Sequence, residues 1–179
     1  MLNEYNAKEH IAFMERALCL AQTAAQLGEV PVGAVIVKDG KIIAEGYNRR
    51  EADKNAVKHA EMIAIDEACR RLGGWRLWQC SMYVTLEPCP MCAGAVINSR
   101  IKTLVFGAYD KKAGCCGSVT NLFEMPFNHS PLVIGGVCEE QAAKQLSDFF
   151  AQLREKMKSN PKDTFQKPWK NAADAGQKK

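Results

Sequence analysis

The sequence has no uncharged apolar run approaching the ~18–20 residues that a membrane-spanning helix requires. Its first residues, Met1 to Tyr5, also lack the basic and then apolar pattern of a secretory signal peptide. We therefore expect a cytoplasmic protein without a membrane partner. No internal repeat is present, and a content of 47% hydrophobic and 25% charged residues excludes a disordered or fibrous chain.

The net charge is also close to zero over most of the chain. The formal net charge is +4, but residues 152–179 contain eight basic and three acidic residues, which leaves −1 on residues 1–151. We expect one domain over residues 1–158 and a basic, disordered tail over residues 159–179. A basic tail can contact a polyanion, but it is also typical of a soluble chain end, so charge alone does not identify a nucleic-acid partner.

Histidine is rare, with only His10, His59 and His129 present. Cysteine is not rare, because the chain contains eight. In the expected cytosolic location thiols stay reduced, so metal binding or plain burial is a better explanation for these cysteines than disulfides. Any metal site that uses histidine must therefore draw on a short set of residues.

Hydrophobic periodicity and turn residues predict helices over residues 8–27, 59–72, 90–98 and 139–157. Strands are predicted over residues 32–37, 42–47, 81–86, 103–107 and 132–134. This order indicates an α/β fold, a three-layer α-β-α sandwich with a central mixed five-stranded sheet and helices on both faces. The loop over residues 108–131 is long enough to suggest a functional role. The last helix is expected to face inward through Ala142, Ala143, Leu146, Phe149, Phe150 and Leu153.

Two short motifs carry the candidate chemistry. His59-Ala60-Glu61 stands where a polar loop becomes a helix, and Pro88-Cys89-Pro90-Met91-Cys92 stands where a strand becomes a helix. Unpaired backbone N–H groups and the positive dipole end at a helix start favour thiolate over thiol. Two thiolates and one imidazole give the three protein ligands of a catalytic zinc with an open position for water. The adjacent Cys115 and Cys116 would chelate a single ion poorly.

Glu61 completes the candidate site because it lies two residues from His59 and can sit beside the metal without binding it. A carboxyl group in a closed apolar site has a raised pKa, so it can act first as a base and then as an acid. Each motif alone has an ordinary explanation, since Cys-x-x-Cys can be a redox or core pair and His-x-Glu can be a helix start. Their conjunction favours a catalytic metal site.

Together these motifs resemble the zinc-dependent nucleoside and nucleobase deaminases, whose signature is His-x-Glu followed by Pro-Cys-x-x-Cys. Further segments resemble the bacterial tRNA-specific adenosine deaminases within that family, and the resemblance covers residues 8–155. These segments are Val30-Pro31-Val32-Gly33-Ala34-Val35, Gly46-Tyr47-Asn48, Thr85-Leu86-Glu87-Pro88, Phe106-Gly107-Ala108 and Ser147-Asp148-Phe149-Phe150.

The resemblance implies a cytidine deaminase-like fold and hydrolytic deamination of adenosine to inosine at the wobble position of a tRNA anticodon. It implies one zinc ion per subunit, which activates water and is bound by His59, Cys89 and Cys92, with Glu61 as the proton shuttle. It also implies a homodimer and a tRNA anticodon stem-loop as partner. Residues expected to contact the substrate are Asn48 at the flipped base, Val32 and Leu86 lining the pocket, and Asp110, Asn128 and Phe149 at the RNA.

Two alternatives stay open. The first is a deaminase of a free nucleobase, guanine or cytosine, which would share the zinc motif on the same fold. The second is a zinc-stabilised RNA-binding or scaffold protein without activity. Glu61 argues against the second alternative, because a structural metal site has no use for a carboxylate that is not a ligand.

Overall fold

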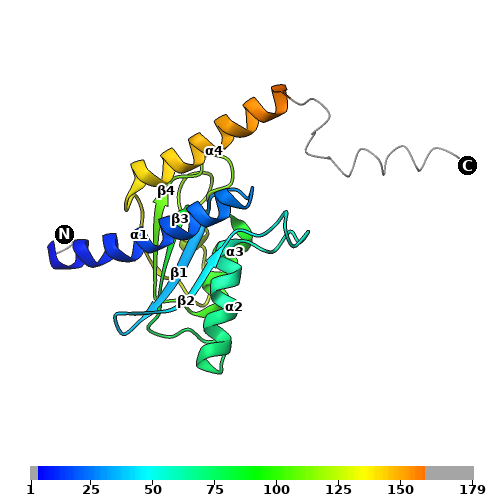
Figure 1. The fold of residues 1–179 in the computed structure, drawn as a ribbon. Helices are drawn as coiled ribbons and strands as arrows, with labels where there is room; N and C mark the ends of the chain where they lie inside the picture. Colours follow the sequence, from blue (N-terminus) through cyan, green and yellow to red (C-terminus); the bar gives the residue numbers. More distant parts are fainter. Residues whose placement is uncertain (1–3, 160–179) are drawn as a thin grey trace, which may run out of the picture. The chain divides into compact units, whose positions relative to one another are not determined.

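The computed structural model describes residues 4–159 (Figure 1). The predicted elements are all present in the predicted order, and their ends agree within two residues except for the first helix, which begins four residues early. In chain order they are α1 (Glu4–Gln26), β1 (Gly33–Lys38), β2 (Lys41–Tyr47), α2 (Ala60–Leu72), β3 (Ser81–Leu86), α3 (Pro90–Ser99), β4 (Thr103–Ala108), the 3₁₀-helix η1 (Leu122–Glu124), β5 (Leu132–Ile134) and α4 (Glu139–Ser159).

The chain divides into two compact units, and the division falls within α4, between Leu146 and Ser147. The expected basic tail lies, from residue 160 onward, outside the described residues. The division into a domain over residues 1–158 and a tail over residues 159–179 therefore stays a prediction. None of the helices in the described part of the chain has the length and apolar character needed to cross a membrane.

The strands form one five-stranded sheet in the order β2-β1-β3-β4-β5. Strand β1 runs antiparallel to β2 and β3, whereas β3, β4 and β5 run parallel, so the sheet is mixed as predicted. A tight turn at Asp39 and Gly40, both with positive φ, joins β1 to β2. Helix α3 is the crossover between β3 and β4, as a parallel pair requires.

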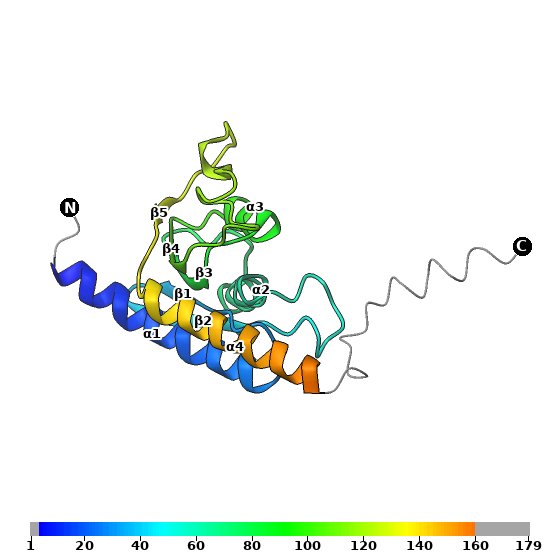
Figure 2. The ribbon, with the colours of Figure 1, turned by 90° about the horizontal axis from the view of Figure 1, so that it is seen from above.

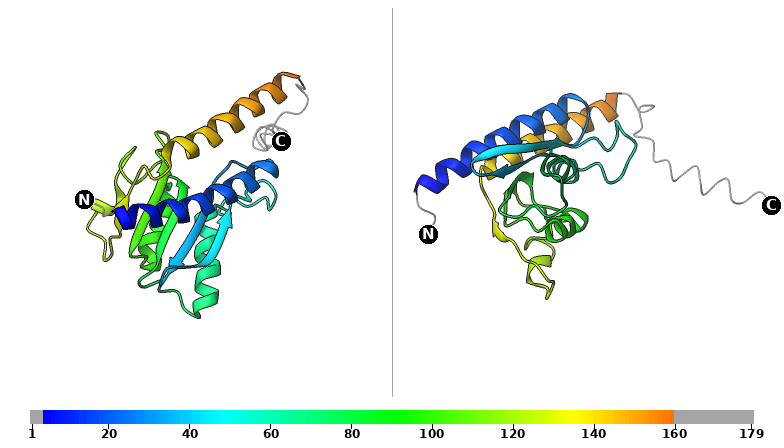
Figure 3. Two further views of the ribbon diagram at one scale, coloured as in Figure 1. Left: turned by 60° about the vertical axis from the view of Figure 1, so that its left-hand side comes forward. Right: turned by 90° about the horizontal axis from the view of Figure 1, so that it is seen from below.

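Alternate strand residues face two hydrophobic clusters, one on each side of the sheet. Figure 2 shows α1 along one face and α2 and α3 along the other, and Figure 3 shows the same layers from two further directions. The cluster under α2 and α3 contains strand residues Ala34, Ile36, Met82, Val84, Leu104 and Phe106. The cluster under α1 and the first turns of α4 contains Val35, Val37, Tyr83 and Val105. The three-layer sandwich is therefore confirmed.

The predicted inward face of the last helix is partly wrong. Ala142 is buried and Leu146, one turn later, packs against the same cluster, but Ala143 is exposed and Phe150 is 41% exposed. Ala143 follows Ala142 by one residue, so its side chain points about 100° away from that of Ala142 around the helix. The apolar stripe that contacts the sheet is narrower than the sequence pattern indicates.

Two glycines let helices approach the sheet more closely than any other residue would. A Cβ atom at Gly33 of β1 would lie 2.6 Å from the backbone nitrogen of Ala21 in α1. A Cβ atom at Gly46 of β2 would overlap the carbonyl oxygen of Ala60 and lie 2.9 Å from the backbone nitrogen of Ala64 in α2. Gly46 therefore determines how closely the first turn of α2 sits on the sheet.

We predict that Gly46→Ala lowers the free energy of unfolding by about 1–3 kcal/mol, because the added methyl group meets backbone atoms that cannot rotate away. Urea unfolding monitored by circular dichroism measures the change. The matched control is Gly74→Ala, since a Cβ atom at Gly74 has no neighbour within 4 Å. Equal stability of the two variants would show that the close approach of α2 is not required.

Candidate metal centre

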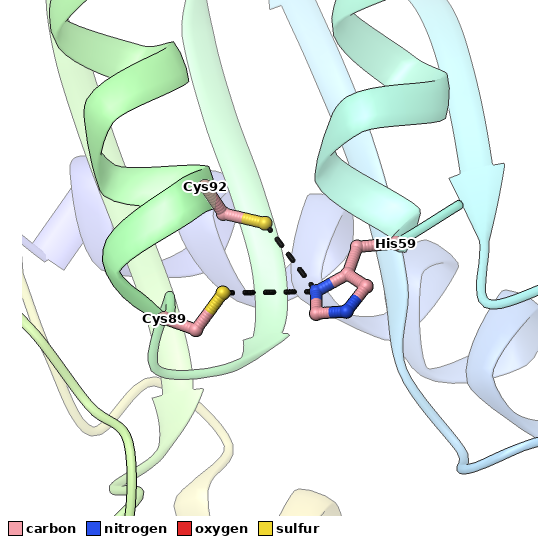
Figure 4. Close-up of side chains that lie close together, drawn as sticks. All are labelled: His59, Cys89 and Cys92. Atoms are coloured by element: carbon pink, nitrogen blue, oxygen red, sulfur yellow. Dashed lines mark hydrogen bonds between the residues drawn. The ribbon is translucent and has the colours of Figure 1, made fainter. Parts of the chain in front are cut away.

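The candidate site forms where two helices begin. Cys89 is the N-cap of α3 with an extended backbone (φ −72, ψ 173), and Pro90 occupies the first turn, where a missing N–H group has no cost. His59 is the N-cap of α2, also with an extended backbone (φ −78, ψ 154). Neither side chain caps its own helix. Both are therefore available to point into the space between the two helix starts, as Figure 4 shows.

Three predicted ligands meet in that space. The Nδ1 atom of His59 lies 3.7 Å from Sγ of Cys89 and 3.5 Å from Sγ of Cys92. All three potential ligand atoms lie within 4.8 Å of one another, and no other group of three metal-ligating side chains meets this condition in the described residues.

The donor set fits zinc. A tetrahedral zinc ion, with bonds of about 2.3 Å to sulfur and about 2.1 Å to nitrogen, holds such ligands about 3.6 Å apart. The observed nitrogen-to-sulfur distances of 3.5 and 3.7 Å agree with that separation. Three protein ligands also leave a fourth position for water, which is typical of catalytic rather than structural zinc.

The two sulfur atoms are electrostatically unequal. Hydrogen bonds from the Cys92 thiol and from His59 lower the pKa of Cys89 to about 4, so Cys89 is a thiolate at neutral pH. Donation to Cys89, together with burial, raises the pKa of Cys92. The hydrogen bond to Cys89 also raises the pKa of His59. A thiolate is the form of cysteine that binds a metal ion, so the lowered pKa of Cys89 suits its place in this group.

Glu61 lies in the first turn of α2 and is only 4% exposed. Burial raises the pKa of this carboxyl group, and the opposing effects of its own backbone N–H and of His59 are smaller. Glu61 is not one of the three grouped ligands. A buried carboxyl group beside such a group, with a pKa raised by burial, suits a proton carrier.

Asn48 connects the start of α2 to the segment before β1. Its Oδ1 atom accepts a hydrogen bond from the backbone N–H of Ala60 at 3.1 Å, and its Nδ2 atom donates to the carbonyl of Val30 at 3.2 Å. Asn48 is 6% exposed. An amide nitrogen carries two protons, so the second remains available to a ligand. Asn48 therefore holds the helix that presents His59, and its contact with a base stays a prediction.

The other predicted substrate contacts are dispersed. Val32 is buried in the cluster beneath α2 and α3, and Leu86 packs against that cluster at the end of β3. Asp110 lies in the loop after β4, where its Oδ1 atom accepts a hydrogen bond from the backbone N–H of Lys112 at 2.9 Å. The substrate contacts of these three residues stay predictions.

The remaining two predicted contacts, Asn128 and Phe149, have interaction partners other than the metal ligands. Asn128 accepts a hydrogen bond from Arg100, the C-cap of α3, at 2.7 Å, whereas Cys89 caps the opposite end of that helix. A helix of this length places the Cα atoms of Arg100 and Cys89 about 15 Å apart. Phe149 belongs to the unit that begins at Ser147, where its ring meets Phe150 edge to face at 5.4 Å. The RNA contacts of both residues stay predictions.

Sequence reasoning missed Glu87, which is 2% exposed. Its carboxylate accepts hydrogen bonds from the backbone N–H groups of Asp110, Cys116 and Ser118, and from the Ser118 hydroxyl. Burial alone would raise the pKa of Glu87, but these hydrogen bonds outweigh it and lower the pKa below its ordinary value. The signal in the sequence is an acidic residue between a buried strand and the Pro-Cys pair.

Comparison with known proteins agrees with this site. Residues 7–108 match the family described as the cytidine and deoxycytidylate deaminase zinc-binding region, more than half of the chain. The chain is 51% identical over 152 residues to the tRNA-specific adenosine deaminase of Bacillus subtilis (strain 168), which covers 84% of this chain and 94% of that protein.

Solved structures agree as well. A structure from work on A-to-I editing by tRNA:A34 deaminases at the wobble position of transfer RNA is similar with a TM-score of 0.74 and 43% identity, over 75% of this chain and 99% of that one. A guanine deaminase from Bacillus subtilis is similar with a TM-score of 0.54 and 34% identity, over 80% of this chain and 92% of that one. The chain belongs to the zinc-binding cytidine and deoxycytidylate deaminase family, and within it to the tRNA-specific adenosine deaminases.

Proposed function

We propose that this protein hydrolyses the adenosine at the wobble position of a tRNA anticodon to inosine. The observation that carries the proposal is the grouping of His59, Cys89 and Cys92 beside the buried Glu61. The proposal is supported by 51% identity to a tRNA-specific adenosine deaminase. The overall reaction adds one water to the adenine ring at C6 and releases ammonia.

His59, Cys89 and Cys92 would hold zinc, which when bound supplies a Lewis acid that makes a coordinated water acidic. Glu61 accepts the proton of the attacking water and delivers it to N1 of adenine. Glu61 then takes the proton of the hydroxyl group now bonded to C6 and passes it to the amino group, so the C6–N bond breaks, ammonia leaves and the C6 carbonyl of inosine forms. Burial raises the pKa of the Glu61 carboxyl group, which makes its carboxylate a stronger base for taking up the proton of water.

The remaining pocket residues orient the base. Asn48 uses its Oδ1 atom to hold the start of α2 and has one Nδ2 proton left for a ring acceptor of the flipped adenine. Val32 and Leu86 supply apolar contacts to the base. An adenosine must leave its stack to enter such a pocket, and in an anticodon loop that step costs less than in a duplex.

We further propose a cytoplasmic homodimer that carries one zinc ion per subunit and binds the anticodon stem-loop. Asp110, Asn128 and Phe149 would contact the RNA around the target nucleotide. A second candidate, a deaminase of free guanine, is favoured by the similarity to the Bacillus subtilis guanine deaminase. Its TM-score of 0.54 and 34% identity are lower than the 0.74 and 43% found with the tRNA:A34 deaminase structure.

The first test is a comparison of substrates. We predict that zinc-loaded protein forms inosine in an anticodon stem-loop with adenosine at the wobble position and releases no ammonia from free adenosine, guanine or cytosine. Inosine is measured by nucleoside digestion and mass spectrometry. Ammonia from free guanine, with an unedited stem-loop, would replace the proposed function with the second candidate.

Glu61→Gln tests the proton carrier. We predict a kcat lower by about two to four orders of magnitude, because the amide cannot exchange the proton, with zinc content unchanged. The matched control is Glu67→Gln, which alters a more exposed acid on the same helix and is expected to keep the full rate. A near-normal kcat for Glu61→Gln would refute the assigned role.

Cys89→Ala tests the metal site. We predict that the purified wild-type protein contains one zinc per chain and that Cys89→Ala loses both the zinc and the activity, since two ligands hold the ion far more weakly than three. Metal content is measured by mass spectrometry of the purified protein. Cys19→Ala, at an exposed cysteine, is the control and should retain its zinc. A zinc-free but active Cys89→Ala protein would contradict the proposal.

A further inference from the structure

Glu87 is a buried acid that takes no part in the proposed chemistry. It directly follows β3 and precedes the Pro88-Cys89 pair, and its backbone N–H donates to the carbonyl of Ala108 at 2.8 Å. The side chain therefore stands where the strand that leads to a metal ligand meets the end of β4. A charge in this position is costly unless hydrogen bonds compensate for it.

The compensating hydrogen bonds come from one loop. The carboxylate accepts from the backbone N–H groups of Asp110 at 3.0 Å, Cys116 at 2.8 Å and Ser118 at 3.1 Å, and from the hydroxyl of Ser118. All four of these hydrogen-bond partners are donors, so a carboxylate, which offers about four acceptor sites and no proton, suits the position. A glutamine there would turn an N–H₂ group toward at least one N–H group.

The same loop is attached to the metal-binding turn at a second point. The backbone N–H of Cys115 donates to the carbonyl of Pro88 at 2.9 Å, next to Cys89. Within the loop, Gly114 donates to the carbonyl of Asp110 at 2.8 Å and closes a turn around the carboxylate. Glu87 is thus the centre of a network that joins residues 110–118 to the turn carrying Cys89.

The packing around Gly114 leaves no space for a side chain. A Cβ atom at Gly114 would overlap the Oε2 atom of Glu87 and lie 2.6 Å from the carbonyl oxygen of Asp110. The adjacent thiols of Cys115 and Cys116 are not part of the group of metal-ligating side chains formed by His59, Cys89 and Cys92. The loop therefore affects the site through its position and not through chemistry of its own.

We propose that Glu87 is a positioning residue that fixes the loop of residues 109–118 against the turn bearing Cys89, and that this loop position determines how tightly the RNA substrate binds. The second half rests on the proposed function, because Asp110 is one of the residues proposed to contact RNA. Glu87 touches neither the metal ligands nor the base in this proposal. Its loss weakens substrate binding and leaves the proton transfers of Glu61 in place.

The test is Glu87→Gln in the full-length, zinc-loaded protein. Hydrogen exchange of the amides of Asp110, Cys116 and Ser118 should become about tenfold faster or more, because each loses a bond to a charged acceptor. Exchange within α3 and the zinc content should not change. With the anticodon stem-loop as substrate, KM should rise about tenfold while kcat stays within about threefold.

Three further variants keep the test decisive. Glu15→Gln, at an exposed acid of α1, is the control and should change nothing. Ser118→Ala removes a single donor and should give a smaller rise in KM with the same sign. If Glu87→Gln does not fold, Gly114→Ala and Ser118→Ala test the same network, since Gly114→Ala displaces the carboxylate without removing it.

Two results would overturn the inference. Unchanged exchange of the three amides in folded Glu87→Gln would show that the carboxylate does not hold the loop. Faster exchange with an unchanged KM would show that the loop position does not govern RNA binding. A wild-type protein that edits no stem-loop would instead refute the proposed function, and the exchange measurement would still decide whether Glu87 fixes the loop.

Discussion

The convergence of two helix starts is the constraint on which the candidate site depends. His59 and Cys89 are the N-caps of α2 and α3, and their ligand atoms, with that of Cys92, must lie within 4.8 Å of one another. The position of α3 is determined by its connection of the parallel strands β3 and β4. The absence of a side chain at Gly46 and the hydrogen bond from Ala60 to Asn48 determine the position of α2. The positions of the metal ligands are therefore set by packing and hydrogen bonds that do not involve the metal.

Two buried glutamates beside this site have opposite electrostatic states. Burial raises the pKa of Glu61, because the opposing effects of its backbone N–H and of His59 are smaller. Glu87 accepts hydrogen bonds from Asp110, Cys116 and Ser118, so its pKa falls and it stays charged. Burial is the main cause of the raised pKa of Glu61, whereas hydrogen-bond donors lower the pKa of Glu87. The same fold thus provides Glu61, which we propose as the proton carrier, and Glu87, which we propose as the residue that positions the loop.

Local patterns explain which features the sequence predicted. The strands alternate, the helices repeat at 3.6 residues, and the three ligands and Glu61 lie in two short motifs, so neighbouring residues carry the information. The network of Glu87 was not predictable in this way, because its donors lie 23 to 31 residues away in a loop without periodicity. The hydrogen bonds of Asn48 to Val30 and Ala60 were missed for the same reason. Ala143 was wrongly predicted to face inward, because an exposed apolar residue next to the buried helix face cannot be told from a buried one by its type.

The metal group does not by itself select the substrate. The chain shares its fold with a tRNA:A34 deaminase structure and with a guanine deaminase, at TM-scores of 0.74 and 0.54. A His-Cys-Cys group with a proton carrier can serve a purine in either setting, so discrimination must come from residues that contact the rest of the substrate. A free base ends at its ring, whereas an anticodon loop continues on both sides of the target. The loop of residues 109–118 is joined to the metal-binding turn through Glu87 and Pro88. We therefore propose that this loop distinguishes the two kinds of substrate, and that the proposed proton transfers of Glu61 are the same for both.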